Sequence, residues 1–223
     1  MGGFADSRRK MVDNQLRTEN VTDLAILAAM GDVPRESFVP TRLKPLAYID
    51  DDLAIKDADG GAAARYLMEP APFARLVQLA EIGASDVVLD IGCGTGYSAA
   101  VLSRLADAVV ALESDPELAE QAAETLLGLD IDNVAVVAGP LEGGYPSEGP
   151  YDVILLEGAV ERVSDALFDQ LKEGGRLVAV VGSGWTASAM VYTSSDGTIA
   201  GRAAFNADVR PLPGFQAPKA FVF

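Results

Sequence analysis

The chain has 223 residues, of which 49% are hydrophobic and 22% are charged, as in an ordinary globular protein. Acidic residues number 33 and basic residues 17, so the formal net charge is −16, and such a surface repels nucleic acid and anionic lipid. The chain has no histidine and one cysteine, Cys93. This composition excludes catalysis by histidine, histidine-ligated metal sites and an intramolecular disulfide.

We expect no metal site, no nucleic-acid partner and no membrane partner. No apolar run reaches the roughly 18 residues that a membrane-spanning helix needs. Basic side chains occur near the N-terminus, but no apolar segment follows them, which predicts no secretory signal and a cytoplasmic location. The composition leaves the oligomeric state open.

Residues 1–83 are predicted to form a helical and irregular extension that packs on the core. One helix is capped by Asp6 or Ser7 and runs to Leu16, and a second follows Asp23 and ends near residue 31.

Three further segments complete this extension. Pro34 and Pro40 bracket a piece that we expect to be extended. Residues 50–61 are acidic and rich in turn-forming residues, which predicts a surface loop. Pro70 then opens a helix that ends near Gly83.

Strands and helices alternate from residue 86 onward. The strands are short, rich in β-branched residues and almost entirely apolar, which predicts a parallel sheet covered on both faces. Repeated strand–helix units favour right-handed crossovers. We therefore expect residues 84–223 to form an α/β domain with a doubly wound, mostly parallel, seven-stranded Rossmann-like sheet. The predicted strands are 87–91, 109–113, 134–137, 152–156 and 177–181, then partly antiparallel closing strands at 190–192, 203–205 and 220–223; the predicted helices are 97–105, 116–127 and 164–171.

The first strand of this domain ends in a glycine-rich loop that reads Asp90-Ile91-Gly92-Cys93-Gly94-Thr95-Gly96-Tyr97. Glycines there permit a tight turn and let a ligand approach the backbone. A dinucleotide-binding loop has the pattern G-x-G-x-x-G/A, and Tyr97 stands where its last Gly or Ala would be. This departure argues against NAD or FAD, and the chain has no G-K-[ST] triplet of a nucleoside-triphosphate loop.

Two carboxylates near this loop suit a cationic ligand that has no phosphate, such as S-adenosylmethionine. Asp90, at the entry of the loop, can hold the cationic amino-acid end, and Glu113, at the end of the second strand, can accept hydrogen bonds from both ribose hydroxyls. We interpret Cys93 as a small loop residue, since no base stands near it in the sequence. S-adenosylmethionine is therefore the predicted cofactor, bound by Asp90, Gly92, Gly94, Gly96, Tyr97 and Glu113.

Several motifs resemble the protein-L-isoaspartate O-methyltransferase family. Residues 33–40 resemble its V-P-R-x-x-F-V-P signature, and residues 11–17 resemble its N-terminal helix. Residues 89–97 are similar to its cofactor loop, residues 167–177 to its D-Q-L-K-x-G-G-R-L segment, and residues 210–214 to its C-terminal end. The resemblance implies a methyltransferase sheet and S-adenosylmethionine as cofactor.

The resemblance also implies a repair enzyme that methylates the α-carboxyl group of L-isoaspartyl residues in damaged proteins or peptides. Such a carboxylate is already a nucleophile, so no general base is needed. The enzyme supplies position and an in-line approach to the methyl group. This chemistry suits a chain without histidine.

Two stretches depart from the family pattern. In its G-x-G-Q-T-I-S-Q-P stretch, Pro70 matches the proline, but Met68 stands at the serine and Glu69 at the glutamine. A thioether donates no hydrogen bond, and a glutamate repels a carboxylate. Met68, Glu69 and Pro70 are therefore candidates for the substrate loop, and the catalytic residues stay open.

The second departure follows the third strand of the domain, where the family has G-D-G and its acid contacts adenine. Pro140 replaces this acid and has no backbone N–H donor. We expect adenine to be held by backbone groups near Leu141 or by Glu142.

Other interpretations stay open. If the substrate site has diverged, the methyl acceptor is a neutral or cationic small molecule. The negative charge of Glu69 favours such an acceptor, and Arg65 would then pair with Glu69. A binding or scaffold protein that kept the fold and lost turnover is suggested by Pro140. A nicotinamide oxidoreductase is disfavoured by Tyr97.

Overall fold

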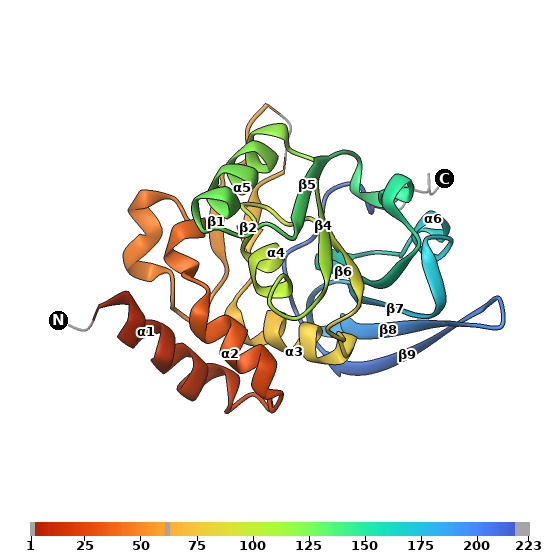
Figure 1. The fold of residues 1–223 in the computed structure, drawn as a ribbon, viewed down its shortest axis with the longest axis horizontal. Coiled ribbons are helices and arrows are strands. Elements are labelled where there is room, and N and C mark those ends of the chain that lie inside the picture. Colours follow the sequence, from red (N-terminus) through yellow and green to blue (C-terminus); the bar gives the residue numbers. More distant parts are fainter. Residues whose placement is uncertain (1–2, 61–62, 217–223) are drawn as a thin grey trace, which may run out of the picture.

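The computed structural model describes residues 3–60 and 63–216. A seven-stranded sheet and a separate two-stranded hairpin make up its β-structure. The helices α1, α2 and α3 lie together along one side of the molecule, and β8 and β9 extend away from them (Figure 1). No helix in the described part of the chain is long and apolar enough to cross a membrane.

The N-terminal helices pack on one another and on the sheet domain. α1 (Phe4–Met11) continues into a π-helical turn (Val12–Leu16). α2 (Leu24–Asp32) begins at Asp23, whose carboxylate accepts hydrogen bonds from two backbone N–H groups of the first turn. α3 (Pro70–Ala80) shares one apolar cluster with both helices. The three helices predicted for this part of the chain are confirmed.

The piece between Pro34 and Pro40 is a 3-10 helix (Arg35–Phe38) instead of the extended segment that we predicted. A 3-10 helix places side chains three residues apart on one face. Arg35 and Phe38 are both fully buried, and Arg35 donates hydrogen bonds to two backbone carbonyls of other segments. This inward anchoring explains the helical turn. A second 3-10 helix follows at Thr41–Leu46.

The predicted surface loop 50–61 is wrong for four of its residues, because β1 (Leu53–Lys56) pairs antiparallel with β2 (Arg65–Leu67). Leu53 and Ile55 are buried on one face of this hairpin. A strand with only two buried apolar residues in alternation gives a weak sequence pattern, and the acidic residues on both sides made this segment look like a loop.

The large sheet has the predicted doubly wound, mostly parallel architecture. Its order is β5-β4-β3-β6-β7-β8-β9, with parallel pairing from β5 to β7 and antiparallel pairing of the last two strands. The strands are β3 (Val87–Ile91), β4 (Ala108–Glu113), β5 (Val134–Ala138), β6 (Tyr151–Val160), β7 (Leu171–Val181), β8 (Ser188–Ser195) and β9 (Thr198–Asn206). The predicted strand 220–223 lies outside the described residues.

Three helices follow the strands: α4 (Tyr97–Leu102), α5 (Pro116–Gly128) and α6 (Asp165–Phe168). The predicted helix 164–171 is therefore shorter than expected. From residue 171 onward the chain already pairs with β6, as β7. Because β7 begins there, the backbone groups are used by the sheet and cannot continue a helix.

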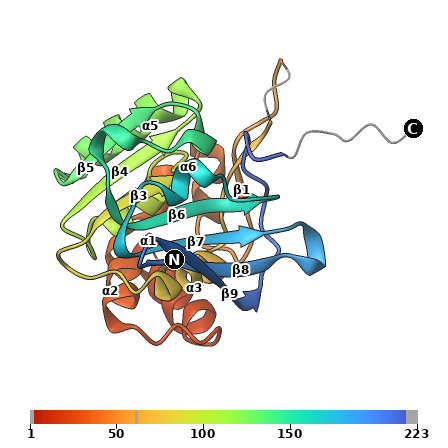
Figure 2. The same cartoon turned by 90° about the vertical axis from the view of Figure 1, so that its right-hand side faces the viewer.

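Two apolar clusters cover the two faces of the sheet. α3, α4 and the N-terminal helices share one cluster with inward-facing residues such as Val88 and Val153. α6 and the segment that ends with Phe215 share the other cluster with Leu89 and Ile154. Figure 2 shows α5 along one edge of this sheet and the hairpin β8–β9 at the other. Helices on both faces agree with the predicted fold class, and the proposed division of the chain at residue 83 stays a prediction.

Candidate cofactor and substrate site

The strand order reverses beside β3, because the chain leaves β3 for β4 and β5 on one side and returns to β6 on the other. In open α/β sheets, ligands bind outside the carboxyl ends of the strands at such a switch point. The glycine loop lies there. Gly92 and Gly94 have φ angles of 86° and 56°, a left-handed conformation that favours glycine.

Asp90 is completely buried at the end of β3. Its Oδ2 accepts a hydrogen bond of 2.7 Å from the hydroxyl of Ser98 on α4, whereas its Oδ1 is buried without a hydrogen-bond partner. Burial raises the pKa of Asp90 to about 7, and the nearby charge of Glu113 acts in the same direction. The loop therefore has one buried acceptor oxygen with no protein donor.

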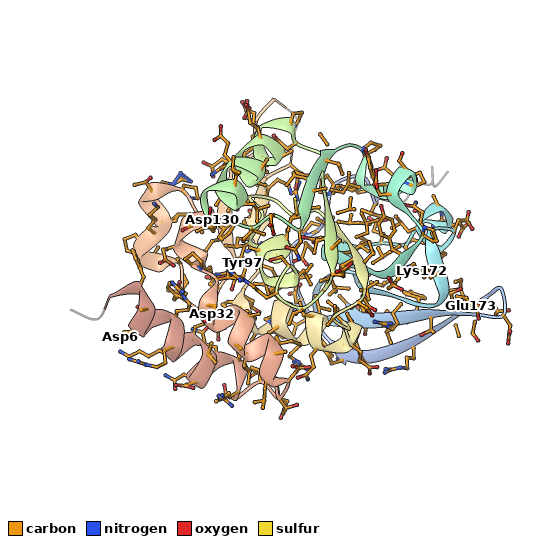
Figure 3. The ribbon with its side chains drawn as sticks, in the orientation of Figure 1. Asp6, Asp32, Tyr97, Asp130, Lys172 and Glu173 are labelled. Atoms are coloured by element: carbon orange, nitrogen blue, oxygen red, sulfur yellow. The ribbon has the colours of Figure 1, made fainter. Side chains whose placement is uncertain are left out.

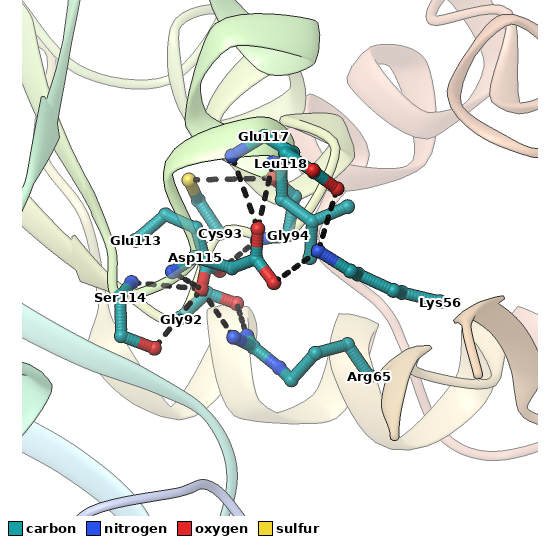
Figure 4. A network of polar contacts seen from close by, with 10 residues as sticks. All are labelled: Lys56, Arg65, Gly92, Cys93, Gly94, Glu113, Ser114, Asp115, Glu117 and Leu118. Carbon is teal, nitrogen blue, oxygen red and sulfur yellow. Dashed lines mark hydrogen bonds and ion pairs between the residues drawn. The ribbon is translucent and has the colours of Figure 1, made fainter. Parts of the chain in front are cut away.

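Glu113, at the end of β4, is completely buried and accepts several hydrogen bonds (Figure 4). Its Oε2 accepts from the N–H of Gly94 at 2.8 Å, and its Oε1 accepts from the N–H of Ser114 at 2.8 Å and that of Asp115 at 3.0 Å. Arg65 of β2 forms an ion pair with the same Oε1. The carboxylate that we predicted for the ribose is thus held by a guanidinium.

The pair of Arg65 with Glu69 that one interpretation of the sequence suggested does not form. One terminal nitrogen of Arg65 contacts Glu113, and Nη2 donates to the carbonyl of Gly92 at 3.2 Å. The buried Glu113 is a better partner for a guanidinium than a carboxylate at the solvent edge, because the low dielectric strengthens the interaction. Lys56 of the same hairpin contacts Asp115 and Glu117 near the start of α5.

Two segments that are distant in the sequence cover the glycine loop. A methyl group added to Gly94 would lie 2.7 Å from Ile55 of the hairpin, and one added to Gly92 would lie 2.6 Å from Leu212. The segment around Leu212 is held to β6, since Ala159 N–H donates to Arg210 O at 2.9 Å and Leu212 N–H donates to Ala159 O at 2.8 Å. We call residues 210–212 the strap.

Tyr97 and Leu141, also predicted to bind the cofactor, are buried, and the Arg35 guanidinium lies 4.8 Å from the centre of the Tyr97 ring. Tyr97 lies in the interior, whereas Asp6 and Glu173 lie at the periphery (Figure 3). The Tyr97 ring packs at 5.7 Å from that of Phe38. Leu141 is buried on the other face of the sheet. For Tyr97 and Leu141 the predicted contact with a cofactor stays a prediction.

Cys93 is buried within the loop. Burial raises the pKa of its thiol well above the usual value, so the thiol stays protonated. This favours its interpretation as a small loop residue.

Met68, Glu69 and Pro70, the substrate-loop candidates, connect β2 to α3. The Met68 carbonyl accepts a hydrogen bond of 2.6 Å from Arg35, and Pro70 is the first residue of α3. Glu69 lines a cavity, and partial burial, followed by the charge of Asp52, raises the pKa of its carboxyl group.

The cavity beside Glu69 has a volume of about 560 Å³ and lies next to the strap, at the carboxyl ends of β6 and β7. Arg210 is the lining residue with a positive charge, and it contacts Asp52 at 3.2 Å. The acidic lining residues are Asp51, Asp52, Glu69, Glu161 and Asp208.

Glu157, which lies in β6 beside the glycine loop, was not among the residues predicted from the sequence. Its Oε1 is buried without a hydrogen-bond partner, and it lines a small cavity together with Gly92 and Ser98. Burial raises the pKa of Glu157 well above its usual value, and the charge of Asp90 adds to this. The sequence did contain one sign of its position, because Glu157 is a single charged residue directly after the apolar strand residues 153–156.

The family model described as Protein-L-isoaspartate(D-aspartate) O-methyltransferase matches residues 6–211. The chain belongs to this family. A protein-L-isoaspartate O-methyltransferase of Koribacter versatilis is 41% identical over 181 residues, which cover 81% of this chain and 79% of that protein. One of Rhodopseudomonas palustris is 36% identical over 210 residues, which cover 94% of this chain and 83% of that protein. The family predicted from the motifs is thereby confirmed.

Solved structures of the family share the fold. One protein-L-isoaspartate O-methyltransferase has a TM-score of 0.79 at 29% identity and covers 93% of this chain and 67% of its own. A putative one from Plasmodium falciparum, in complex with S-adenosyl-L-homocysteine, has a TM-score of 0.77 at 20% identity and covers 93% of this chain and 98% of its own. The second likeness carries the fold alone, and the fold class is confirmed.

Proposed function

We propose that the chain is an S-adenosylmethionine-dependent methyltransferase that methylates the α-carboxyl group of L-isoaspartyl residues in damaged proteins, in the cytoplasm. The observation that carries the proposal is the glycine loop at the switch point, where a buried oxygen of Asp90 has no protein donor. The family match over residues 6–211 and the names of the relatives support it.

The residues at the loop suit the cofactor, with one rearrangement. Asp90 would hold the ammonium group, and Gly92, Gly94 and Gly96 would let the ligand approach the backbone, with Tyr97 and Leu141 nearby. Both oxygens of Glu113 already accept from backbone N–H groups and from Arg65. Glu113 would therefore hold the ribose hydroxyls only after Arg65 has moved away from it. When bound, S-adenosylmethionine supplies an electrophilic methyl group on a sulfonium.

The acceptor side of the proposal rests on the cavity of about 560 Å³ beside the strap. An isoaspartyl carboxylate needs no base, so this chain's residues have only to orient it and exclude water. Glu69 lines this cavity, and Met68 and Pro70 flank Glu69 in the chain. All three stay candidates for the substrate loop, with a protein or peptide as the partner and no nucleic acid.

A second candidate function is methyl transfer to a cationic or neutral small molecule. The observation in its favour is the lining of the same cavity, where five carboxylates stand against one guanidinium. Such a field attracts cations and disfavours an acidic peptide.

Transfer of a labelled methyl group to a synthetic L-isoaspartyl peptide tests the proposal, with the same peptide carrying normal aspartate as the control. We expect a base-labile methyl ester on the isoaspartyl peptide alone. If S-adenosylhomocysteine binds in calorimetry but neither peptide is labelled, the cofactor assignment stands and the acceptor is a different one. If S-adenosylhomocysteine does not bind at millimolar concentration, the methyltransferase proposal is wrong.

A further inference from the structure

Asp90 and Glu157 come from adjacent parallel strands and lie on the same face of the sheet. In the register of β3 and β6, Asp90 is opposite Leu155. Leu155 and Ala159 both belong to the apolar cluster on one face of the sheet, so Glu157, between them in the alternation, lies on that face despite an irregularity of β6 there. Each carboxylate has one buried oxygen without a hydrogen-bond partner, Oδ1 of Asp90 and Oε1 of Glu157. Two buried acceptor oxygens therefore lie on one face of neighbouring strands, near enough for the charge of Asp90 to act on Glu157.

The space beside these carboxylates is small and otherwise mostly apolar. Glu157 lines a cavity of about 10 Å³, whose other walls include Gly92, Met68 and Phe73. Ser98, which holds the other oxygen of Asp90, lines the same cavity. This volume is close to that occupied by one water molecule, and an ammonium group has a similar size.

No ion pair neutralises either carboxylate in the described part of the chain. Arg65 is committed to Glu113. Arg35 uses Nε and Nη2 for the carbonyls of Ala47 and Met68; its Nη1 is buried without a partner, and its charge acts on Glu157 without forming an ion pair with it. Asp90 is completely buried, whereas Glu157 is partly exposed and has one buried oxygen, Oε1, without a partner. A buried carboxylate oxygen without a partner is costly, and a second one nearby raises the cost further. The missing complement is a small cation with several N–H donors.

We infer that Glu157, together with Asp90, binds the ammonium group at the amino-acid end of the cofactor. The inference rests on the proposed function and adds a second carboxylate that selects ligands carrying that group. An ammonium group has three donors and can serve both unpartnered oxygens at once. Glu157 is then a specificity-determining residue for the amino-acid part of the ligand.

Calorimetry with two ligands tests the inference: S-adenosylhomocysteine, which has the ammonium group, and 5′-methylthioadenosine, which lacks the amino-acid part. We expect Glu157→Gln to weaken S-adenosylhomocysteine about tenfold or more and to leave 5′-methylthioadenosine within about twofold of the wild type. Glu124→Gln, at an exposed position of α5, is the matched control and should change neither affinity.

An equal loss for both ligands, or no loss for either, would overturn the role of Glu157 while the proposed cofactor stands. If the wild type binds neither ligand at millimolar concentration, the proposed function fails and the inference fails with it. Thermal unfolding without ligand provides a second readout. Glu157→Gln should raise the Tm at about pH 8, because it removes a carboxyl group that ionises freely in the unfolded chain and is harder to ionise in the folded protein; a lower Tm would indicate a structural role instead.

Discussion

At the scale of single residues, the buried ion pair between Arg65 and Glu113 decides the state of the cofactor loop. Both side chains are almost completely buried, and they join β2 to the end of β4 across 48 residues of sequence. Removal of one partner from a buried pair leaves an uncompensated charge, whose cost exceeds that of an exposed pair.

Arg65→Met should therefore lower the free energy of unfolding by about 3 kcal/mol, as measured by urea denaturation. Lys56→Met, on the same hairpin but at a more exposed ion pair, is the control and should have a much smaller effect. We also expect S-adenosylhomocysteine to raise the Tm of Arg65→Met more than that of the wild type, since Glu113 is then free for the ribose. A variant as stable as the wild type would contradict the importance of this pair.

Asp90 is expected to make the stability depend on pH. Burial raises its pKa from 3.8 to about 7, so the folded protein keeps a proton that the unfolded chain has already released. This contribution favours folding at low pH and is lost as the pH rises through about 7.

Asp90→Asn keeps an acceptor for Ser98 and removes the titration. The Tm of the wild type minus that of Asp90→Asn should therefore fall between about pH 5 and about pH 8. Differential scanning calorimetry can measure this difference, with Asp107→Asn at an exposed position as the control. A difference that does not change with pH would show that Asp90 titrates in its ordinary range.

At the scale of elements, the strap is joined to β6 by close backbone contact at Gly158. A methyl group added there would lie 2.7 Å from the carbonyl oxygen of Arg210 and 2.9 Å from Leu212. Only a residue without a side chain lets the strap approach β6 this closely. The strap covers the glycine loop through Leu212, and its position there depends on its contact with Gly158 of β6.

Gly158→Ala should push the strap away and lower the free energy of unfolding by about 1–3 kcal/mol. Hydrogen exchange should accelerate at the N–H groups of Ala159 and Leu212, whose bonds hold the strap to β6. Gly128→Ala is the control, because nothing lies within 4 Å of the added methyl group there. Unchanged exchange at both N–H groups would mean that the strap is held by other contacts.

At the scale of the whole molecule, the net charge of −16 opposes the compact state. Repulsion among acidic surface residues is screened by salt, with a Debye length of about 10 Å at 0.1 M. The Tm should therefore rise when KCl is increased from about 20 mM to about 500 mM, and light scattering should exclude association as the cause. A falling Tm would mean that attractive ion pairs outweigh the net repulsion.

Local patterns in the sequence were sufficient for much of the architecture and for the family. The apolar strands predicted a doubly wound sheet, which the structure has. The glycine loop and the motif at residues 33–40 predicted the family, which the family match confirmed. These features are encoded by neighbours in the chain, where periodicity and turn chemistry act. Asp90 and Glu113 also lie at strand ends, and the sequence alone placed them at the switch point.

Tertiary structure alone decided which charged groups meet. The partner of Arg65 is Glu113 and not the nearby Glu69, because the hairpin β1–β2 folds over the glycine loop. Glu157 lies beside Asp90 because β6 returns next to β3, a pairing between strands more than 60 residues apart. Buried electrostatics depend on such long-range contacts and on the removal of water, and neither is written in a local sequence pattern.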